Sequence, residues 1–208
     1  MSSTSENFEL KQAANQTRMI AIANSSRILA DCFWEPRLPG SEAWELLALA
    51  SLDLGGQAPE MASAARAYAS ELDPDQLPVL FSELFIGPFK VLAPPYGATY
   101  LDGDPSDAGR TQAEALGYYH QAGLVLPPHA GETPDHISVE LEFIYFLMVR
   151  SIQEDALDCV DMAAQFSAHH LGRWLPLFAK QLQLPEEAKF YQTLCQLALL
   201  LVQSTRSL

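Results

Sequence analysis

Apolar residues recur at helical spacing along almost the whole chain, and no segment alternates between apolar and polar residues as a half-buried β-strand does. Leu and Ala are far more frequent than Val and Ile, which favours helix because unbranched side chains lose less rotamer freedom there. The pattern therefore predicts an all-α protein, an irregular helical bundle of about 8–10 helices with a proline-rich hinge loop.

Proline and glycine residues divide this helical pattern at defined points, because proline cannot continue a helix and glycine commonly ends one. One further helix, centred on 163–174, is expected to be kinked or broken near Pro176. The other helices are expected over about 10–34, 41–54, 59–72, 77–86, 105–122, 134–148 and 187–204.

Two stretches rich in proline and glycine, 87–103 and 126–133, are predicted to be irregular. The length of 208 residues suits one all-helical domain that spans residues 1–208. The second irregular stretch is the best candidate for a hinge, at 126–134, between a possible N-terminal subdomain, 1–125, and a C-terminal one, 135–208.

The chain is strongly acidic, with 12 Lys and Arg against 26 Asp and Glu and a net charge of -14. Such a charge repels phosphate groups, which excludes nucleic acid and anionic membrane surfaces as good partners and favours a cationic one. Between residues 99 and 142 a single arginine, Arg110, stands against eight acidic residues: Asp102, Asp104, Asp107, Glu114, Glu132, Asp135, Glu140 and Glu142. An acidic rim around the irregular segments is therefore predicted to receive a basic peptide.

Motifs for common enzyme chemistry are absent from the sequence: it has no phosphate-binding glycine loop, no GxSxG elbow and no CxxC pair. Cys32 and Cys195 fall on apolar helical stripes, where free cysteine packs as a small apolar residue. The first residues are polar, and the longest apolar run, 143–149, is too short to cross a bilayer. We therefore expect a cytoplasmic protein that is neither an enzyme nor embedded in a membrane and that needs no cofactor.

Two other functions are compatible with these residues. His136 and Glu140 are spaced to share one helix face, and with His170 they could form the centre of a metal-dependent helical-bundle enzyme. Alternatively, the acidic loops could make the chain a general scaffold for protein interactions.

Three segments in this order resemble the TorD/DmsD family of redox-enzyme maturation chaperones. They are Leu84–Pro88 followed by Ala93–Tyr100, then Pro134–Ile137 continuing into Glu140–Phe143, and finally His170–Phe178 with Phe190-Tyr191 after it. The resemblance covers the chain from about Phe81 to its C-terminus, whereas the first 75 or so residues match only in being helical.

The resemblance implies an all-α cytoplasmic chaperone, a monomer or homodimer. Its partners would be the twin-arginine signal peptide and the catalytic subunit of a molybdopterin oxidoreductase, whose cofactor loading and assembly it would support before export. Positions that bind the peptide in the family correspond here to Phe81, Leu84, Phe85, Pro95, Tyr96, Asp135 and His136.

The arginines and the apolar stretch of such a peptide are expected to contribute unequally to its affinity. An exposed arginine–carboxylate pair contributes only about 0.2–1 kcal/mol, whereas micromolar affinity requires about 8 kcal/mol. The apolar stretch must therefore supply most of the affinity by burial in an apolar groove, while the acidic residues orient and discriminate.

Overall fold

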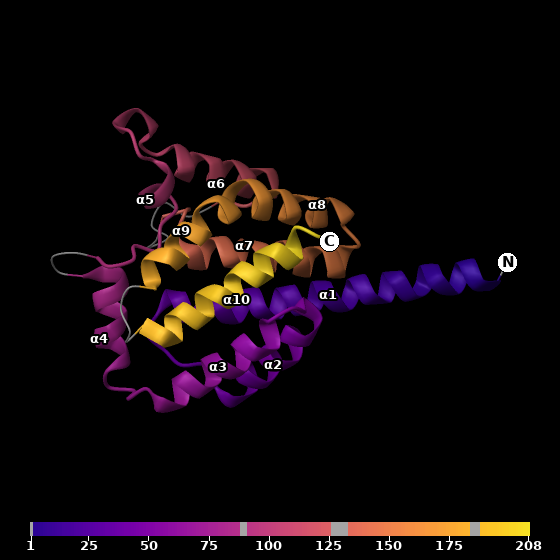
Figure 1. Cartoon of the computed structure of the whole chain (residues 1–208). Coiled ribbons are helices and arrows are strands. Elements are labelled where there is room, and N and C mark those ends of the chain that lie inside the picture. Colours follow the sequence, from indigo (N-terminus) through magenta and orange to yellow (C-terminus); the bar gives the residue numbers. More distant parts are fainter. Residues whose placement is uncertain (1, 88–90, 126–132, 184–187) are drawn as a thin grey trace.

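The computed structural model describes residues 2–87, 91–125, 133–183 and 188–208, and it is all-helical there, which confirms the predicted fold class. None of the described helices combines the length and hydrophobicity that a membrane crossing requires. The α-helices, labelled as in Figure 1, are α1 (Ser2–Trp34), α2 (Ser41–Leu54), α3 (Ala58–Glu71), α4 (Leu77–Phe81), α5 (Ala98–Leu101), α6 (Arg110–Gln121), α7 (Ile137–Glu154), α8 (Leu157–Phe166), α9 (Gly172–Leu182) and α10 (Lys189–Thr205).

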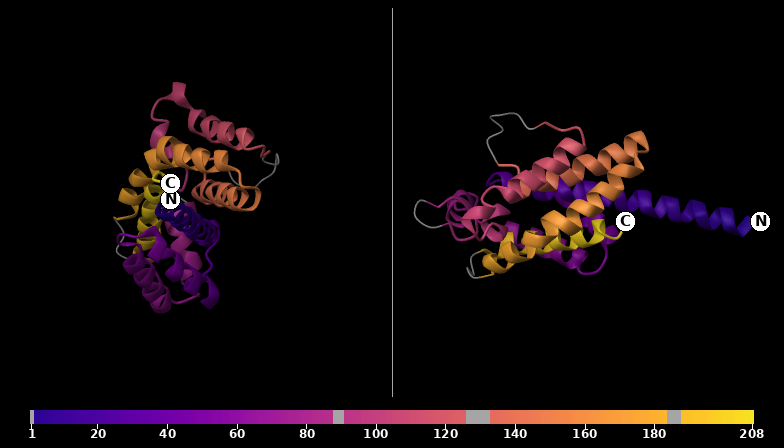
Figure 2. Two further views of the ribbon diagram at one scale, coloured as in Figure 1. Left: turned by 90° about the vertical axis from the view of Figure 1, so that its right-hand side faces the viewer. Right: turned by 90° about the horizontal axis from the view of Figure 1, so that it is seen from above.

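The long helix α1 runs through the middle of the bundle. It packs against α7, α2 and α10, and α3 packs against α10 from the same side as α2 (Figure 1). Helices α6 and α8 lie beyond α7, on the opposite side from α2 and α3 (Figures 1 and 2). The N-terminal part of α1 extends past the other helices, and residues 10–17 are exposed.

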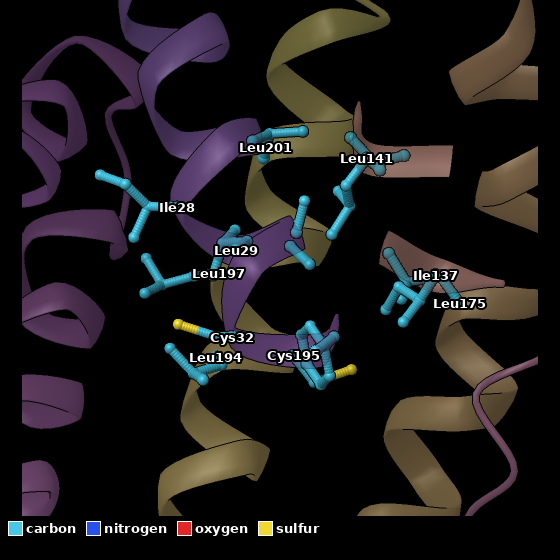
Figure 3. Close-up of a cluster of buried hydrophobic side chains, with 14 of the residues drawn as sticks. Ile28, Leu29, Cys32, Ile137, Leu141, Leu175, Leu194, Cys195, Leu197 and Leu201 are labelled. Atoms are coloured by element: carbon cyan, nitrogen blue, oxygen red, sulfur yellow. The ribbon is translucent and has the colours of Figure 1, made fainter. Parts of the chain in front are cut away.

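The core forms where α1, α7, α9 and α10 meet (Figure 3). Leu29 of α1, Leu141 of α7, Leu175 of α9 and Leu194 and Cys195 of α10 are all fully buried there. This core joins helices from both sides of the predicted hinge at 126–134, most of which lies outside the described residues.

Several predicted helix ends agree with the structure to within a residue. Helix α1 ends at Trp34, two residues before Pro36, and α2 ends at Leu54, before Gly55 in a left-handed conformation with φ of 74°. The predicted helix over 77–86 is present, but its second half is a π-helical turn, Ser82–Ile86, that stops at Gly87.

Three predictions of local structure are wrong. The helix expected from Pro105 starts only at Arg110, because Gly109 has a φ of 80° and separates α6 from a short 3-10 turn. The helix expected from Pro134 starts at Ile137, because the backbone before it pairs with another segment. Pro176 lies inside α9, and the α-helix is interrupted earlier, by a π-helical turn at Ser167–Leu171.

The π-helical turn before α9 depends on Gly172. Its backbone N–H donates to the carbonyl oxygen of Ser167, the spacing of a π-helical bond. A Cβ atom on Gly172 would collide with that same carbonyl oxygen, which belongs to the backbone and cannot move aside cheaply.

Replacing Gly172 by alanine is therefore expected to destabilise the fold by about 1–3 kcal/mol, as overpacking does elsewhere. The control is Gly117→Ala on the exposed face of α6, where a Cβ would meet no atom within 4 Å. That change should be neutral or stabilising, because alanine favours helix over glycine by about 0.5–1 kcal/mol. Urea unfolding followed by circular dichroism measures both, and equal stability of the two variants would contradict the role of Gly172.

Candidate functional site

Two of the recognisable segments pair with each other through their backbones. The N–H of Gly97 donates to the carbonyl oxygen of Asp135 at 2.9 Å, and the N–H of Ile137 donates to that of Pro95, also at 2.9 Å. Tyr96 and His136 thus form an antiparallel bridge, the one isolated bridge within the described residues. We refer to residues 95–98 and 133–137 as the paired loops.

Asp135 holds the paired loops together from inside. One carboxylate oxygen accepts a hydrogen bond from the N–H of Ala98 at 2.8 Å, and the other accepts one from the Thr133 hydroxyl at 2.7 Å. The side chain exposes 0% of its surface. With both oxygens engaged and no exposed surface, Asp135 shapes the loops in this conformation and does not present its charge to solvent.

His136 connects the paired loops to α7 and to an aromatic surface. Its Nδ1 accepts a hydrogen bond from the N–H of Ser138 at 3.2 Å and so caps the start of α7. The imidazole lies edge-on to the ring of Tyr96, with centroids 5.0 Å apart, and to that of Trp34, 6.2 Å away. Pro95 is buried, Tyr96 is half-buried and Trp34 is exposed, so this part of the site reaches the surface.

Beneath the paired loops, Glu140 of α7 is fully buried and binds two side chains of the third recognisable segment. Its carboxylate pairs with Nε2 of His170 at 2.9 Å and accepts a hydrogen bond from Nε1 of Trp174 at 3.1 Å. The indole of Trp174 also lies against the backbone of Gly97, where a Cβ would come within 3.0 Å of Nε1. Glu140 thus joins the second and third recognisable segments directly, and Trp174 connects them to the first.

Burial changes the proton affinity of this pair. It raises the pKa of Glu140 to about 7, although the hydrogen bonds from His170 and Trp174 act in the opposite direction. Burial by itself would lower the pKa of His170, but the hydrogen bond and charge of Glu140, together with the charge of Glu114, outweigh it and raise that pKa. The folded chain thus holds both protons more tightly than the unfolded chain does.

The other predicted site residues, Phe81, Leu84 and Phe85, lie in the core. Leu84 exposes 1% of its surface and Phe85 5%. Phe85 packs edge-on against Phe33 and Tyr191, with centroids 6.0 and 4.9 Å away. In this conformation the three side chains are enclosed by the core and offer little surface to a ligand.

The alternative metal centre on His136, Glu140 and His170 is not formed. Among the described residues, no group of three His, Cys, Asp or Glu side chains is arranged to hold a metal ion. Glu140 and His170 contact each other, but Nδ1 of His136 is occupied by the backbone N–H of Ser138. The cysteines offer no alternative: all three are buried, and burial raises the pKa of Cys32 to about 12.

A groove of about 800 Å³ runs along α7 on the side of the C-terminal end of α6. Its first residue on α7 is Val139, three positions after His136, which caps the start of that helix. Carboxylates of Glu142 and Glu154 and the guanidinium of Arg150 stand among an apolar lining of Tyr119, Leu124, Val139, Phe143, Tyr145, Phe146 and Val149.

The sequence did not single out Trp34 or the residues of this groove. Trp34 follows Phe33, which is fully buried, and nothing in the helical pattern distinguishes the exposed ring from the buried one. Phe146 and Val149 belong to a helix that is apolar nearly all round, from which a fully buried position was expected.

Comparison with known proteins agrees with this architecture. A sequence profile of the family described as nitrate reductase delta subunit matches residues 49–180. The chaperone protein TorD of Shewanella loihica is 32% identical over 200 residues, which cover 88% of this chain and 89% of that protein. The chaperone protein TorD of Psychrobacter sp. is 30% identical over 130 residues, 61% of this chain and 58% of that protein. DmsD of Haemophilus influenzae, named as a Tat proofreading chaperone, is 27% identical over 123 residues, 59% of this chain and 57% of that protein.

These relatives are named as chaperones and not as enzymes. The chain belongs to the nitrate reductase delta subunit family, and the predicted relationship to the TorD/DmsD maturation chaperones is confirmed. The match spans less than three-fifths of the Psychrobacter and Haemophilus relatives, at 58% and 57% of their lengths.

Because Glu140 and His170 bind protons more tightly in the folded chain, the stability of the fold should depend on pH. Stability from Glu140 is fully present below its unfolded pKa of 4.5 and is lost as the pH rises towards about 7. The contribution of His170 to stability is present below its unfolded pKa of 6.5 and is lost as the pH rises through its higher folded pKa. Relative to Glu140→Gln, which can still bond to both partners, the wild type should lose up to about 1.4 kcal/mol of stability per pH unit between about pH 5 and pH 7.

Urea unfolding at a series of pH values measures this difference. If the stability of the wild type and of Glu140→Gln changes with pH in parallel, the pKa of Glu140 is not raised in the folded chain. Glu140→Ala should cost about 3–5 kcal/mol at neutral pH, because it leaves a buried histidine and indole N–H without their partner.

Proposed function

We propose that the chain is a cytoplasmic chaperone that binds the twin-arginine signal peptide of a molybdopterin oxidoreductase and supports the cofactor loading and assembly of that enzyme before export. Support comes from its relatives, one of which is named for Tat proofreading, and from a family description that refers to nitrate reductase. The chain itself would carry no catalytic step; it would hold the leader of its client while the cofactor is inserted.

One geometric observation carries this proposal: the groove along α7 begins at Val139, three residues after His136 of the paired loops. His136 lies against Tyr96 and Trp34, and Glu142 at the groove pairs with Arg27 of α1, which also pairs with Asp31. A signal peptide has the matching order, two arginines followed by an apolar stretch. Its charged part would lie at the aromatic end and its apolar part in the groove.

The apolar lining of the groove replaces Leu84 and Phe85 as the source of affinity. Those two side chains are buried in the core, so they add no contact surface without local unfolding. Phe146, Val149 and Tyr145 are only half-buried and offer apolar surface that a bound segment would remove from water. Each 100 Å² covered would contribute about 2.5 kcal/mol before the cost of immobilising the peptide.

Calorimetry with a synthetic peptide tests the proposal directly. The peptide carries two adjacent arginines and an apolar stretch, and wild-type protein is expected to bind it at micromolar concentration. Val149→Asp places a charge in the groove and should weaken binding at least tenfold. The control is Val79→Asp on α4, at a position that is already 49% exposed and lies outside the groove, and it should bind as the wild type does.

Circular dichroism establishes first that both variants are folded. Failure of the wild type to bind the peptide would contradict the proposed function. If Val149→Asp binds the peptide as tightly as the wild type does, the groove is not where the peptide binds. A peptide with serines in place of the apolar stretch should lose most of the affinity, and unchanged binding of that peptide would favour a general acidic scaffold.

A further inference from the structure

Three aromatic rings from separate segments meet at the C-terminal end of α1: Trp34 is exposed, Tyr96 is half-buried and His136 is buried behind them. Trp34 is 48% exposed, whereas Phe33 before it is fully buried. Trp34 lies nearly perpendicular to His136, at 87°, and His136 lies at 66° to Tyr96. We call Trp34, Tyr96 and His136 the aromatic surface.

Negative charge gathers beside this surface. Asp31, Trp34 and Glu35 are spaced at i, i+3 and i+4, which places them on one side of the last turn of α1. A helix carries partial negative charge at its C-terminus, and α1 has no basic residue in its last turn to offset it.

The arginines near this turn do not fully neutralise its negative charge. Arg27 is shared between Asp31 at 3.1 Å and Glu142 at 2.8 Å, while Arg37 pairs with Glu35 at 3.2 Å. Two arginines thus face three carboxylates in these ion pairs. Both Asp31 and Glu35 keep solvent-accessible side chains, and exposed pairs of this kind are weak enough for an incoming cation to compete.

We propose that the aromatic surface, together with the carboxylates of Asp31 and Glu35, is where the chain contacts the arginine side chains of its peptide partner. A guanidinium group can lie flat on an indole ring and at the same time form a bidentate pair with a carboxylate. Lysine has no planar group that does both. This inference rests on the proposed function and names the chain's contact for the arginine pair, with Trp34 as the residue that distinguishes arginine from lysine.

The test compares two peptides that differ only in the charged pair, arginine–arginine or lysine–lysine, each followed by the same apolar stretch. Wild-type protein should bind the arginine peptide about fivefold to tenfold more tightly. Trp34→Ala and Trp34→Leu should both lose most of this preference, because only the carboxylates would still distinguish arginine from lysine. Trp34→Phe keeps an aromatic face and should keep part of the preference.

The leucine variant separates the two roles of the indole, because it retains apolar area but offers no aromatic face to a cation. Leu49→Ala on α2 is the matched surface control, since Leu49 is 63% exposed and belongs neither to the aromatic surface nor to the lining of the groove; it should leave both affinities unchanged.

The carboxylates are tested by Asp31→Asn combined with Glu35→Gln. This double variant should weaken binding of both peptides about threefold to tenfold and flatten the dependence of affinity on salt. Glu60→Gln combined with Glu71→Gln removes the same charge from exposed positions on α3 and should have little effect.

The outcomes separate this inference from the proposed function. If wild-type protein binds neither peptide, the proposed function fails and this inference fails with it. If the wild type binds both peptides equally, or if folded Trp34→Leu keeps the full preference for arginine, the aromatic surface is not the arginine contact and the proposed function stands.

Discussion

The carboxylate of Glu140 lies fully buried in the bundle, where it accepts a hydrogen bond from Trp174 and pairs with His170. Removing a charged group from water is costly unless its oxygens find partners, so the two side chains must stay in place around it. Trp174 in turn supports the backbone of Gly97, at one end of the paired loops. Through this one carboxylate, α7, α9 and the paired loops are held in a single arrangement.

The surface proposed to bind the peptide depends on that arrangement, but it is formed by residues other than Glu140, His170 and Trp174. Asp135 and Glu140 are sealed inside, and their hydrogen bonds position the loop that carries Tyr96 and the start of α7 that carries His136. Phe81 and Phe85 are also buried, and their rings pack edge-on against each other in the neighbouring core. Substituting such buried residues is expected to change binding through the folding of the site, whereas Trp34 is exposed and Val149 lines the groove.

The helices were largely predictable because their signals are local. A proline after Trp34 and a glycine after Leu54 end α1 and α2 through the conformations that these residues allow. The start of α7 was not predictable in the same way. The backbone near Asp135 pairs with Pro95 and Gly97, which lie almost forty residues earlier, and no local pattern reveals a partner at that separation.

The sequence by itself determined that the chain is all-helical, which family it belongs to and which segments carry the family resemblance, because helical periodicity and short motifs are properties of neighbouring residues. Only the tertiary structure decided which residues of those segments face outward. A helix that is apolar nearly all round is compatible with several orientations, and packing against α1 and α8 selects the one that buries Glu140 and leaves Val149 at a groove. On α1, Phe33 packs against Phe85, Phe178 and Tyr191 in the core, and its neighbour Trp34 is left at the surface.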